Sequence, residues 1–204
     1  GLCSKLEDIK ATYLSCASVM CLTETWLNST HKDSDIKFDG FRVFRSDRCS
    51  SNCRGGVAIY VKNDILWETI DLPGNDHNIE ILMLRLTLKM RNLLLVVIYR
   101  PTSVSVTISK NAICECLQII EQHADVDNVI VTGDFNENLN NAETHHLFNL
   151  LTAHGYLQLV KQSTFLTGSL LDVVYVKGEL EFLRADVEPI YFSDHEMVSI
   201  NIPP

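Results

Sequence analysis

The chain has 204 residues, 46% of them hydrophobic and 21% charged, and it carries a formal net charge of -9. This composition is typical of a folded globular protein, excludes a disordered or fibrous chain, and at this length favours a single domain over residues 1–204. The acidic balance argues against tight autonomous binding of DNA, because such binding depends on Lys and Arg side chains that release phosphate counterions.

The first third of the chain combines one helix with three strands. Apolar residues at helical spacing predict a helix over residues 4–18, with Ser4 and Glu7 forming a capping box at its start. A short apolar run predicts a buried strand over residues 19–23. Two further strands, each after a glycine turn signal, are expected over residues 41–44 and 57–61.

The middle of the chain predicts a hairpin followed by a helix. Two apolar runs, residues 79–88 and 93–99, are separated by the short polar segment 89–92, which is typical of two antiparallel strands. Helical spacing of apolar residues then predicts a helix over residues 105–124. After the helix at the start of the chain, strands are therefore expected to dominate the first half.

The last third adds one buried strand, one helix and several short strands. An apolar run predicts a strand over residues 129–131, and a helix is expected over residues 141–154, where Gly155 supplies the stop. The remaining apolar runs predict short strands over residues 156–159, 171–176, 186–190 and 196–202. Many strands interleaved with few helices favour an α/β sandwich over an alternating parallel fold.

The sequence also indicates where the protein resides. Its longest dense apolar run, residues 93–99, is too short to span a bilayer, so no membrane partner is expected. Charged residues interrupt the start of the chain, which argues against a secretion signal and predicts an intracellular protein with reduced thiols. Neither Cys49 with Cys53 nor Cys114 with Cys116 has the repeated spacing that is typical of structural zinc.

Acidic and amide side chains lie at the ends of predicted strands. Glu24 directly follows the strand over residues 19–23, although most acids at such positions are simply solvated. Asp134 and Asn136 are two positions apart, and in extended structure this spacing points both side chains to one face and suits a shared ligand. The alternative is an Asx turn, for which Gly133-Asp134 is a natural sequence.

A carboxylate and an imidazole near the end of the chain form a second candidate pair. Asp172 lies on an otherwise apolar strand, where a carboxylate is costly to bury unless it has a partner. His195 is the obvious partner, because Asp172 could accept from one imidazole nitrogen and leave the other for a phosphate. Asp194 adjoins His195 in the sequence, although adjacent residues need not touch.

Six segments of the chain form a pattern in a fixed order. They are Cys21 to Leu27, Arg54 to Tyr60, Tyr99-Arg100-Pro101, Gly133 to Asn136, Ser163-Thr164 with Leu171-Asp172, and Ser193-Asp194-His195. Together they resemble the endonuclease/exonuclease/phosphatase superfamily, and are most similar to the endonuclease of jockey-type and related non-LTR retrotransposons. The resemblance implies a DNase I-like α/β fold, a four-layer sandwich of two packed mixed sheets flanked by helices.

The resemblance also implies a reaction, which is hydrolysis of a DNA phosphodiester with Mg²⁺, or Mn²⁺ in its place, as the cofactor. Glu24 matches the principal metal ligand, and Asp194 is expected to support the metal side. Asp134 matches the residue that positions or deprotonates the attacking water. Asn136 matches an amide that hydrogen-bonds the phosphate without adding negative charge.

The remaining matches are expected to act on the phosphate. His195, oriented by Asp172, would bind a nonbridging oxygen or stabilise the pentacovalent phosphate, with Tyr99 and Thr164 as further donors. The product would carry a 3′ hydroxyl, which such elements use to prime reverse transcription. DNA is therefore the implied partner, and the nucleus is the implied place of action.

The pattern departs from such relatives at the start of the chain. They begin with a strand that carries an Asn of the metal and phosphate site, and we expect the chain to be N-terminally truncated by that strand. Its loss is expected to weaken catalysis and to leave an unpaired edge beside residues 19–23, where self-association or a protein partner is expected. The alternatives are a domesticated, noncatalytic interaction module and another activity of the superfamily, such as phosphoinositide phosphatase action or abasic-site repair.

Overall fold

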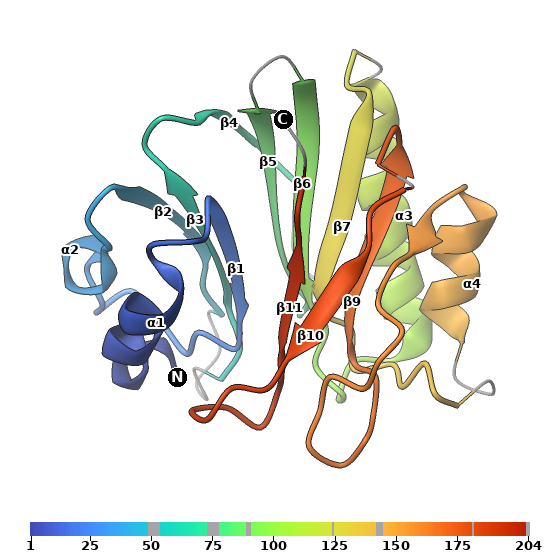
Figure 1. Cartoon of the computed structure of the whole chain (residues 1–204). Helices are drawn as coiled ribbons and strands as arrows, with labels where there is room; N and C mark the ends of the chain where they lie inside the picture. The colour runs from blue at the N-terminus through green and yellow to red at the C-terminus, as the bar shows by residue number, and fades with distance from the viewer. Residues whose placement is uncertain are drawn as a thin grey trace.

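The computed structural model of the protein describes residues 1–48, 54–72, 78–88, 91–123, 125–141, 145–180 and 182–202. These residues form two facing layers of strands with helices on both outer sides (Figure 1). Helices α1 (Leu6–Tyr13) and α2 (Asp33–Ile36) lie outside the smaller layer, and α3 (Val106–Gln122) and α4 (His146–Ala153) lie outside the larger one. The expected four-layer α/β sandwich is confirmed. Among these described residues, no helix combines the length and the apolar character needed to span a membrane.

The smaller layer contains an antiparallel three-stranded sheet. Its strands are β1 (Val19–Thr23), β2 (Phe41–Ser46) and β3 (Val57–Lys62), in the order β1-β3-β2. β3 is central and is buried on both faces, because one face packs against the facing sheet and the other packs in a cluster with residues of η1 and α1, among them Leu2 and Ile9. The predicted strands are confirmed here, and within the described residues β1 pairs with β3 alone.

The first helix differs from the prediction at both ends. Ser4 does not cap it, because Ser4 belongs to the 3-10 turn η1 (Leu2–Ser4) and donates its hydroxyl to the carbonyl of Gly1 at 3.0 Å. Helix α1 therefore begins at Leu6 and ends at Tyr13. The predicted capping box is wrong, because Ser4 lies in a 3-10 turn and the α-helix begins two residues after it.

The larger layer is a six-stranded sheet in the order β4-β5-β6-β7-β9-β8. Its strands are β4 (Leu66–Ile70), β5 (Glu80–Leu88), β6 (Arg91–Tyr99), β7 (Asn128–Asp134), β8 (Leu157–Gln158) and β9 (Asp172–Gly178). The predicted hairpin is confirmed as β5 and β6, although β6 begins at Arg91, inside the segment expected to connect the strands; residues 89 and 90 lie outside the described residues. β6 and β7 form the sheet's parallel pair, which α3 connects.

Both large helices lie where the sequence predicts, with one change of boundary. Ser105 caps α3 by accepting from the backbone N–H of Ile108 at 3.3 Å. Helix α4 begins at His146, later than the predicted start at 141, and residues 142–144 lie outside the described residues. Gly155 follows α4 with a φ of +83°, which fits its predicted role as the stop.

Two further strands, β10 (Ala185–Glu188) and β11 (Met197–Ile200), form their own antiparallel ladder. They lie between β1 and β9 in Figure 1, and in the described residues no ladder joins them to either sheet. The structure thus differs in detail from two mixed sheets. The described residues form three sheets, of which the six-stranded one is mixed and the other two are antiparallel.

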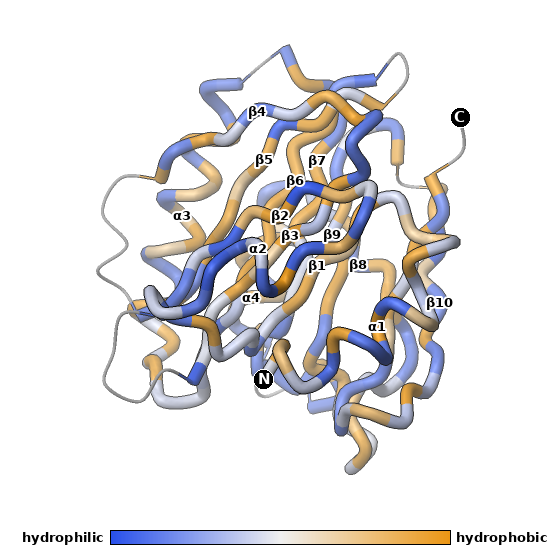
Figure 2. The backbone as a smooth tube through the Cα atoms, turned by 90° about the vertical axis from the view of Figure 1, so that its left-hand side faces the viewer, coloured by the Kyte–Doolittle hydropathy of each residue, from blue (hydrophilic) through white to orange (hydrophobic). Residues whose placement is uncertain are grey.

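The hydrophobic core lies where the two strand layers face each other and under α3 and α4. Figure 2 shows the hydrophobic residues concentrated along the central strands, with hydrophilic residues on the loops. Gly133 of β7 has a φ of +134°, and a Cβ atom there would overlap the carbonyl of Ile98 on β6. A glycine is therefore required at position 133, near the end of the parallel pair β6 and β7 and directly before Asp134.

Of the two cysteine pairs considered for zinc, Cys49 and Cys53 lie outside the described residues. Cys114 and Cys116 are free thiols on α3. Burial raises the pKa of the Cys116 thiol to about 12, which keeps it protonated and makes it a poor metal ligand.

Candidate active site

Three strands of the six-stranded sheet place polar side chains side by side at one rim. β6 ends at Tyr99, β7 ends at Asp134, and β9 begins at Asp172. The register pairs Tyr99 with Asp134 in parallel and Asp134 with Asp172 in antiparallel fashion. Segments that are far apart in the sequence thus meet at one position of the sheet.

Asp134 and Asn136 are brought together by a turn. Asn136 has a left-handed φ of 48°, so it does not continue the extended strand. Its backbone N–H donates to Oδ1 of Asp134 at 2.9 Å, and its Nδ2 donates to Oδ2 of Asp134 at 3.2 Å and to the carbonyl of Arg100 at 2.9 Å. The extended geometry predicted for this pair is wrong, and the Asx turn is the means by which the two side chains meet.

The expected contact between Asp172 and His195 is present. Nδ1 of His195 lies 2.8 Å from Oδ2 of Asp172, and the ring of Phe165 packs edge-on against the imidazole at 4.8 Å between centroids. Burial alone would lower the pKa of His195, but the hydrogen bond and the charge of Asp172 raise it to about 9. His195 is therefore an imidazolium at neutral pH, with Nε2 as its second donor.

Asp134 lies against this pair. Asp134, Asp172 and His195 each offer a ligand atom, and these atoms lie within 4.8 Å of one another. Asp134 is only 2% exposed; burial, and then the charge of Asp172, raises its pKa to about 7. Such perturbed groups gathered at a sheet rim are typical of functional sites. The oxygen donors of two close carboxylates fit a hard divalent cation, which would offset their mutual repulsion.

Glu24 reaches the same rim from the facing sheet. It directly follows β1 with a left-handed φ of 51°, and its Oε1 accepts a hydrogen bond from the hydroxyl of Tyr99. Burial and this hydrogen bond raise the pKa of Tyr99, so the hydroxyl stays protonated. The charge of Glu24 also contributes to the raised pKa of Asp134. Glu24 therefore adds a third, exposed carboxylate to this rim.

A paired arginine supports Tyr99 from the side. The guanidinium of Arg48 lies 5.6 Å from the centroid of the Tyr99 ring and binds both carboxylate oxygens of Glu80, at 2.5 and 2.7 Å. Glu80 is 5% exposed, so this bidentate pair is held away from solvent. Tyr99 is thus fixed between Arg48 and Glu24.

One predicted site residue, Thr164, takes a position that differs from the expectation. Thr164 has no exposed surface, and its Oγ1 accepts from the backbone N–H groups of Leu171 and Asp172 at 3.1 and 3.0 Å. Direct donation to a phosphate does not fit such a buried side chain; Thr164 instead holds the start of β9. Asp194 is exposed, and its charge is among those that raise the pKa of His195.

Arg100 is a structural part of the site to which the sequence assigned no role. It is 9% exposed, and its guanidinium donates to the carbonyls of Phe135 and Asn136 at 3.2 Å each, to the carbonyl of Val104 and to Oγ of Ser109. These bonds fix the backbone that follows Asp134. The sequence pointed to Arg100 only through its place in Tyr99-Arg100-Pro101. Its structural role could not be predicted, because it binds mainly backbone carbonyls of residues that are distant in the sequence.

Glu137 continues this loop and anchors it to α4. It is 6% exposed, and its carboxylate accepts from the backbone N–H groups of His146, Leu147 and Phe148 at 2.8 to 3.0 Å. A carboxylate at a helix start satisfies N–H groups that have no partner within the helix and interacts favourably with the helix dipole. Glu137 therefore ties the site loop to the helix that covers the sheet.

Replacing Glu137 by Gln is expected to lower the free energy of unfolding by about 2 kcal/mol, because an amide group would face backbone donors in a buried position. Urea denaturation followed by circular dichroism measures this change. Glu121→Gln, at an exposed glutamate of α3, is the matched control and should leave the midpoint unchanged. Equal midpoints for both variants would contradict the anchoring role.

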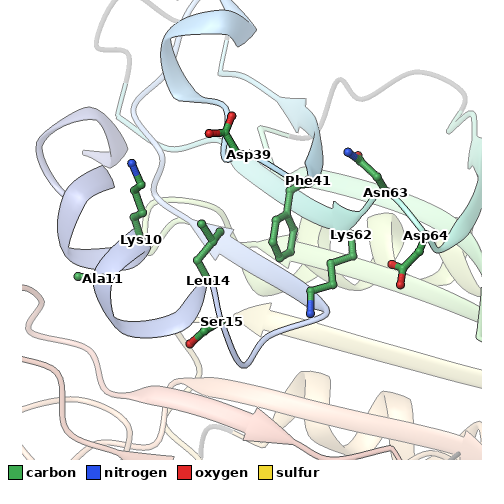
Figure 3. A pocket seen from close by; sticks show the side chains of 10 residues that line it. Lys10, Ala11, Leu14, Ser15, Asp39, Phe41, Lys62, Asn63 and Asp64 are labelled. Atoms are coloured by element: carbon green, nitrogen blue, oxygen red, sulfur yellow. The ribbon is translucent and has the colours of Figure 1, made fainter.

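A groove that is separate from these residues lies on the three-stranded side of the protein. It is an open groove of about 800 Å³ between α1 and the chain around β2 and β3 (Figure 3), lined among others by Lys10, Leu14, Phe41 and Lys62. None of the eight predicted site residues lines it. This groove is therefore separate from the rim that gathers the predicted site residues.

A family model described as the endonuclease/exonuclease/phosphatase family matches residues 2–195. Among solved structures, the chain is similar to the endonuclease domain of TRAS1, a telomere-specific non-LTR retrotransposon. The identity is 20% and the TM-score 0.75, over 99% of this chain and 92% of that one. No curated protein sequence matches the chain.

Two further solved structures share the fold at 14% identity each. They are D. rerio TDP2 complexed with a single-strand DNA product (TM-score 0.67, 98% of this chain and 91% of that one) and a 3′-5′ exonuclease, NExo, from Neisseria meningitidis (TM-score 0.70, 97% and 93%). These likenesses confirm the expected DNase I-like architecture. Because the family model covers nearly the whole chain and the rim residues converge, the chain belongs to the endonuclease/exonuclease/phosphatase family.

Proposed function

We propose that the chain is a Mg²⁺-dependent endonuclease that hydrolyses phosphodiester bonds of DNA. Membership of the family supports hydrolysis of the nuclease or phosphodiesterase type. The observation that carries the proposal is the meeting of Asp134, Asp172 and His195 within 4.8 Å, at a rim that Glu24 also reaches. A base, an oriented imidazolium and oxygen ligands for a cation are what in-line attack of water on a phosphate needs.

Asp134 is the proposed base. Burial and the charge of Asp172 hold its pKa near 7, so its carboxylate can take a proton from water at neutral pH. The side-chain amide of Asn136 donates to the carbonyl of Arg100 and to the carboxylate of Asp134. In this proposal Asn136 therefore orients the base, and it also lies beside the position of the phosphate. The base is thereby held in one orientation before substrate arrives.

His195 is the proposed donor to the phosphate. Its Nδ1 is occupied by Asp172, which leaves Nε2–H for a nonbridging oxygen on which negative charge develops. Thr164 does not touch the phosphate in this proposal; it accepts a hydrogen bond from the backbone N–H of Asp172 and so positions that residue. The hydroxyl of Tyr99 is held at the same rim by Glu24, and in this proposal it is a further donor to the phosphate.

Glu24 is the proposed principal ligand of Mg²⁺, with Asp194 supporting the metal side and Mn²⁺ as a substitute. When bound, the cation supplies charge neutralisation at the scissile phosphate. Hard oxygen donors are the ligands that Mg²⁺ prefers, and the exposure of Glu24 leaves room for the waters that this ion retains. The carboxylates of this rim therefore fit the ion.

By likeness to the TRAS1 domain, we propose that the chain nicks DNA for a non-LTR retrotransposon and acts in the nucleus. Hydrolysis by this route leaves a 3′ hydroxyl. The expected result is that the nicked strand is extended directly by a DNA polymerase supplied with labelled nucleotides. Strands that are extended only after phosphatase treatment would carry 3′ phosphates and would contradict the proposal.

A noncatalytic protein-interaction module is a second candidate. The net charge of -9 disfavours DNA affinity, and the side of β1 opposite β3 carries no described ladder, so a partner or a second copy could pair there. Calorimetry that shows neither Mg²⁺ nor DNA binding by the chain, with a stoichiometric protein complex, would favour this candidate. A monomer whose β1 amides are protected from hydrogen exchange would count against pairing at this edge.

A further inference from the structure

The loop after β1 holds two side chains in a rare backbone conformation. Glu24 has a φ of 51° and Trp26 a φ of 57°, a region that residues other than glycine seldom occupy and that bulky residues occupy least. Such strain persists only where surrounding contacts impose it, and it is common at functional sites. The bonds that impose it here come from the Gly55-Gly56 segment.

The backbone carbonyls of Gly55 and Gly56 accept hydrogen bonds from this loop. The N–H of Trp26 donates to the carbonyl of Gly55 at 2.8 Å, and the N–H of Thr25 donates to the carbonyl of Gly56 at 3.3 Å. A Cβ atom on Gly56, which has a φ of +88°, would lie 2.6 Å from Oγ1 of Thr25. Only glycine lets the two segments approach so closely, and the approach brings Arg54 over Trp26.

Arg54 and Trp26 form a stacked pair on the loop that carries Glu24. The guanidinium carbon of Arg54 lies 5.3 Å from the centroid of the Trp26 ring, Trp26 is 40% exposed, and Arg54 is exposed. Arg48, by contrast, is engaged by Glu80. Arg54 is exposed and forms no ion pair with the described residues, and its partner Trp26 stands two residues after Glu24, the proposed metal ligand.

We propose that Arg54, held over the indole of Trp26, binds a backbone phosphate of the DNA strand that flanks the scissile phosphate. This inference rests on the proposed function and names how its substrate is held. A guanidinium presents a planar pair of donors that matches phosphate, and stacking on an aromatic ring restricts its side chain before DNA arrives. In so acidic a chain, one preorganised cation at the site contributes a large share of the contact with DNA.

The test is the salt dependence of DNA binding. Fluorescence anisotropy of a labelled mixed-sequence duplex with Ca²⁺, from about 50 to 200 mM NaCl, gives the slope of log Kd against log salt. Arg54→Ala is expected to weaken binding about five- to tenfold and to reduce the slope by about 0.9, the share of one phosphate contact. Arg54→Lys should keep the slope while losing affinity, because it keeps the charge and loses the planar stack.

Lys110→Ala, on the helix that covers the opposite side of the six-stranded sheet, is the matched control and should leave both slope and affinity unchanged. Unchanged melting temperatures establish that all variants fold. A wild-type slope in Arg54→Ala, with normal wild-type binding, overturns this inference and leaves the proposed function standing. Absence of DNA binding by the wild-type chain overturns both.

Discussion

His195→Ala is expected to lower the kcat for DNA nicking by about three orders of magnitude, because it removes the only imidazolium of the Asp134, Asp172 and His195 cluster. The side chain is held by Asp172 at 2.8 Å and by the ring of Phe165, so its position is set before substrate binds. Single-turnover nicking of supercoiled plasmid measures the change. His154→Ala, at an exposed histidine remote from this rim, is the matched control and should retain full activity.

Asp172→Asn provides a separate readout of the same pair. Asp172 raises the pKa of His195 to about 9, against the lowering effect of burial, so wild-type activity is expected to fall as the pH rises through about 9. An amide lacks the charge that raises this pKa, and the alkaline limb should therefore move to lower pH in the variant. An alkaline limb at the same pH in both proteins would contradict the assignment of His195 as the protonated donor.

Glu24→Gln is expected to weaken Mg²⁺ binding at least about tenfold, because Mg²⁺ binds few protein carboxylates and this change removes one of them. Isothermal titration with Mg²⁺ and with Mn²⁺ measures the effect. The variant keeps an acceptor for the Tyr99 hydroxyl, so a loss of affinity reports charge rather than packing. Glu121→Gln, at an exposed glutamate, should bind both ions as the wild type does. Equal affinities in Glu24→Gln and wild type would place the ion elsewhere.

Asp134→Asn should change how stability depends on pH in the absence of metal. The pKa of Asp134 rises from its ordinary value of 3.8 to about 7 in the folded chain, so the unfolded chain releases this proton at lower pH. The stability that the protonated group contributes is complete below about pH 4 and is lost as the pH rises through about 7. Thermal denaturation at several pH values should show this loss in the wild type and its absence in the variant.

Much of the fold could be predicted because apolar patterns in this chain are strong. The strand at Val19–Thr23 was predicted with its observed bounds, since a short buried run between polar residues allows few alternatives. The start of α1 was missed because Ser4 enters a 3-10 turn instead of capping. The strand Leu66–Ile70 was not predicted, because its residues are largely exposed and show no clear alternation.

The site could be predicted only as a set of side chains at strand ends. That Asp172 meets His195 followed from the cost of burying an unpaired carboxylate. The supporting contacts could not be predicted, because Arg100 and Glu137 bind backbone groups whose positions depend on the whole fold. For Thr164 the sequence predicted a role that the structure does not support. A threonine at this position suggested a donor to the phosphate, but its side chain is buried and instead positions Asp172.

The most direct test of the central claim is nicking of supercoiled plasmid by the purified chain with Mg²⁺ and with EDTA, alongside a Glu24→Ala, His195→Ala double variant. The account predicts nicked circles with Mg²⁺ and the wild-type chain, and intact plasmid with EDTA or with the variant. Equal nicking by the wild type and the double variant, or nicking that persists in EDTA, would contradict it.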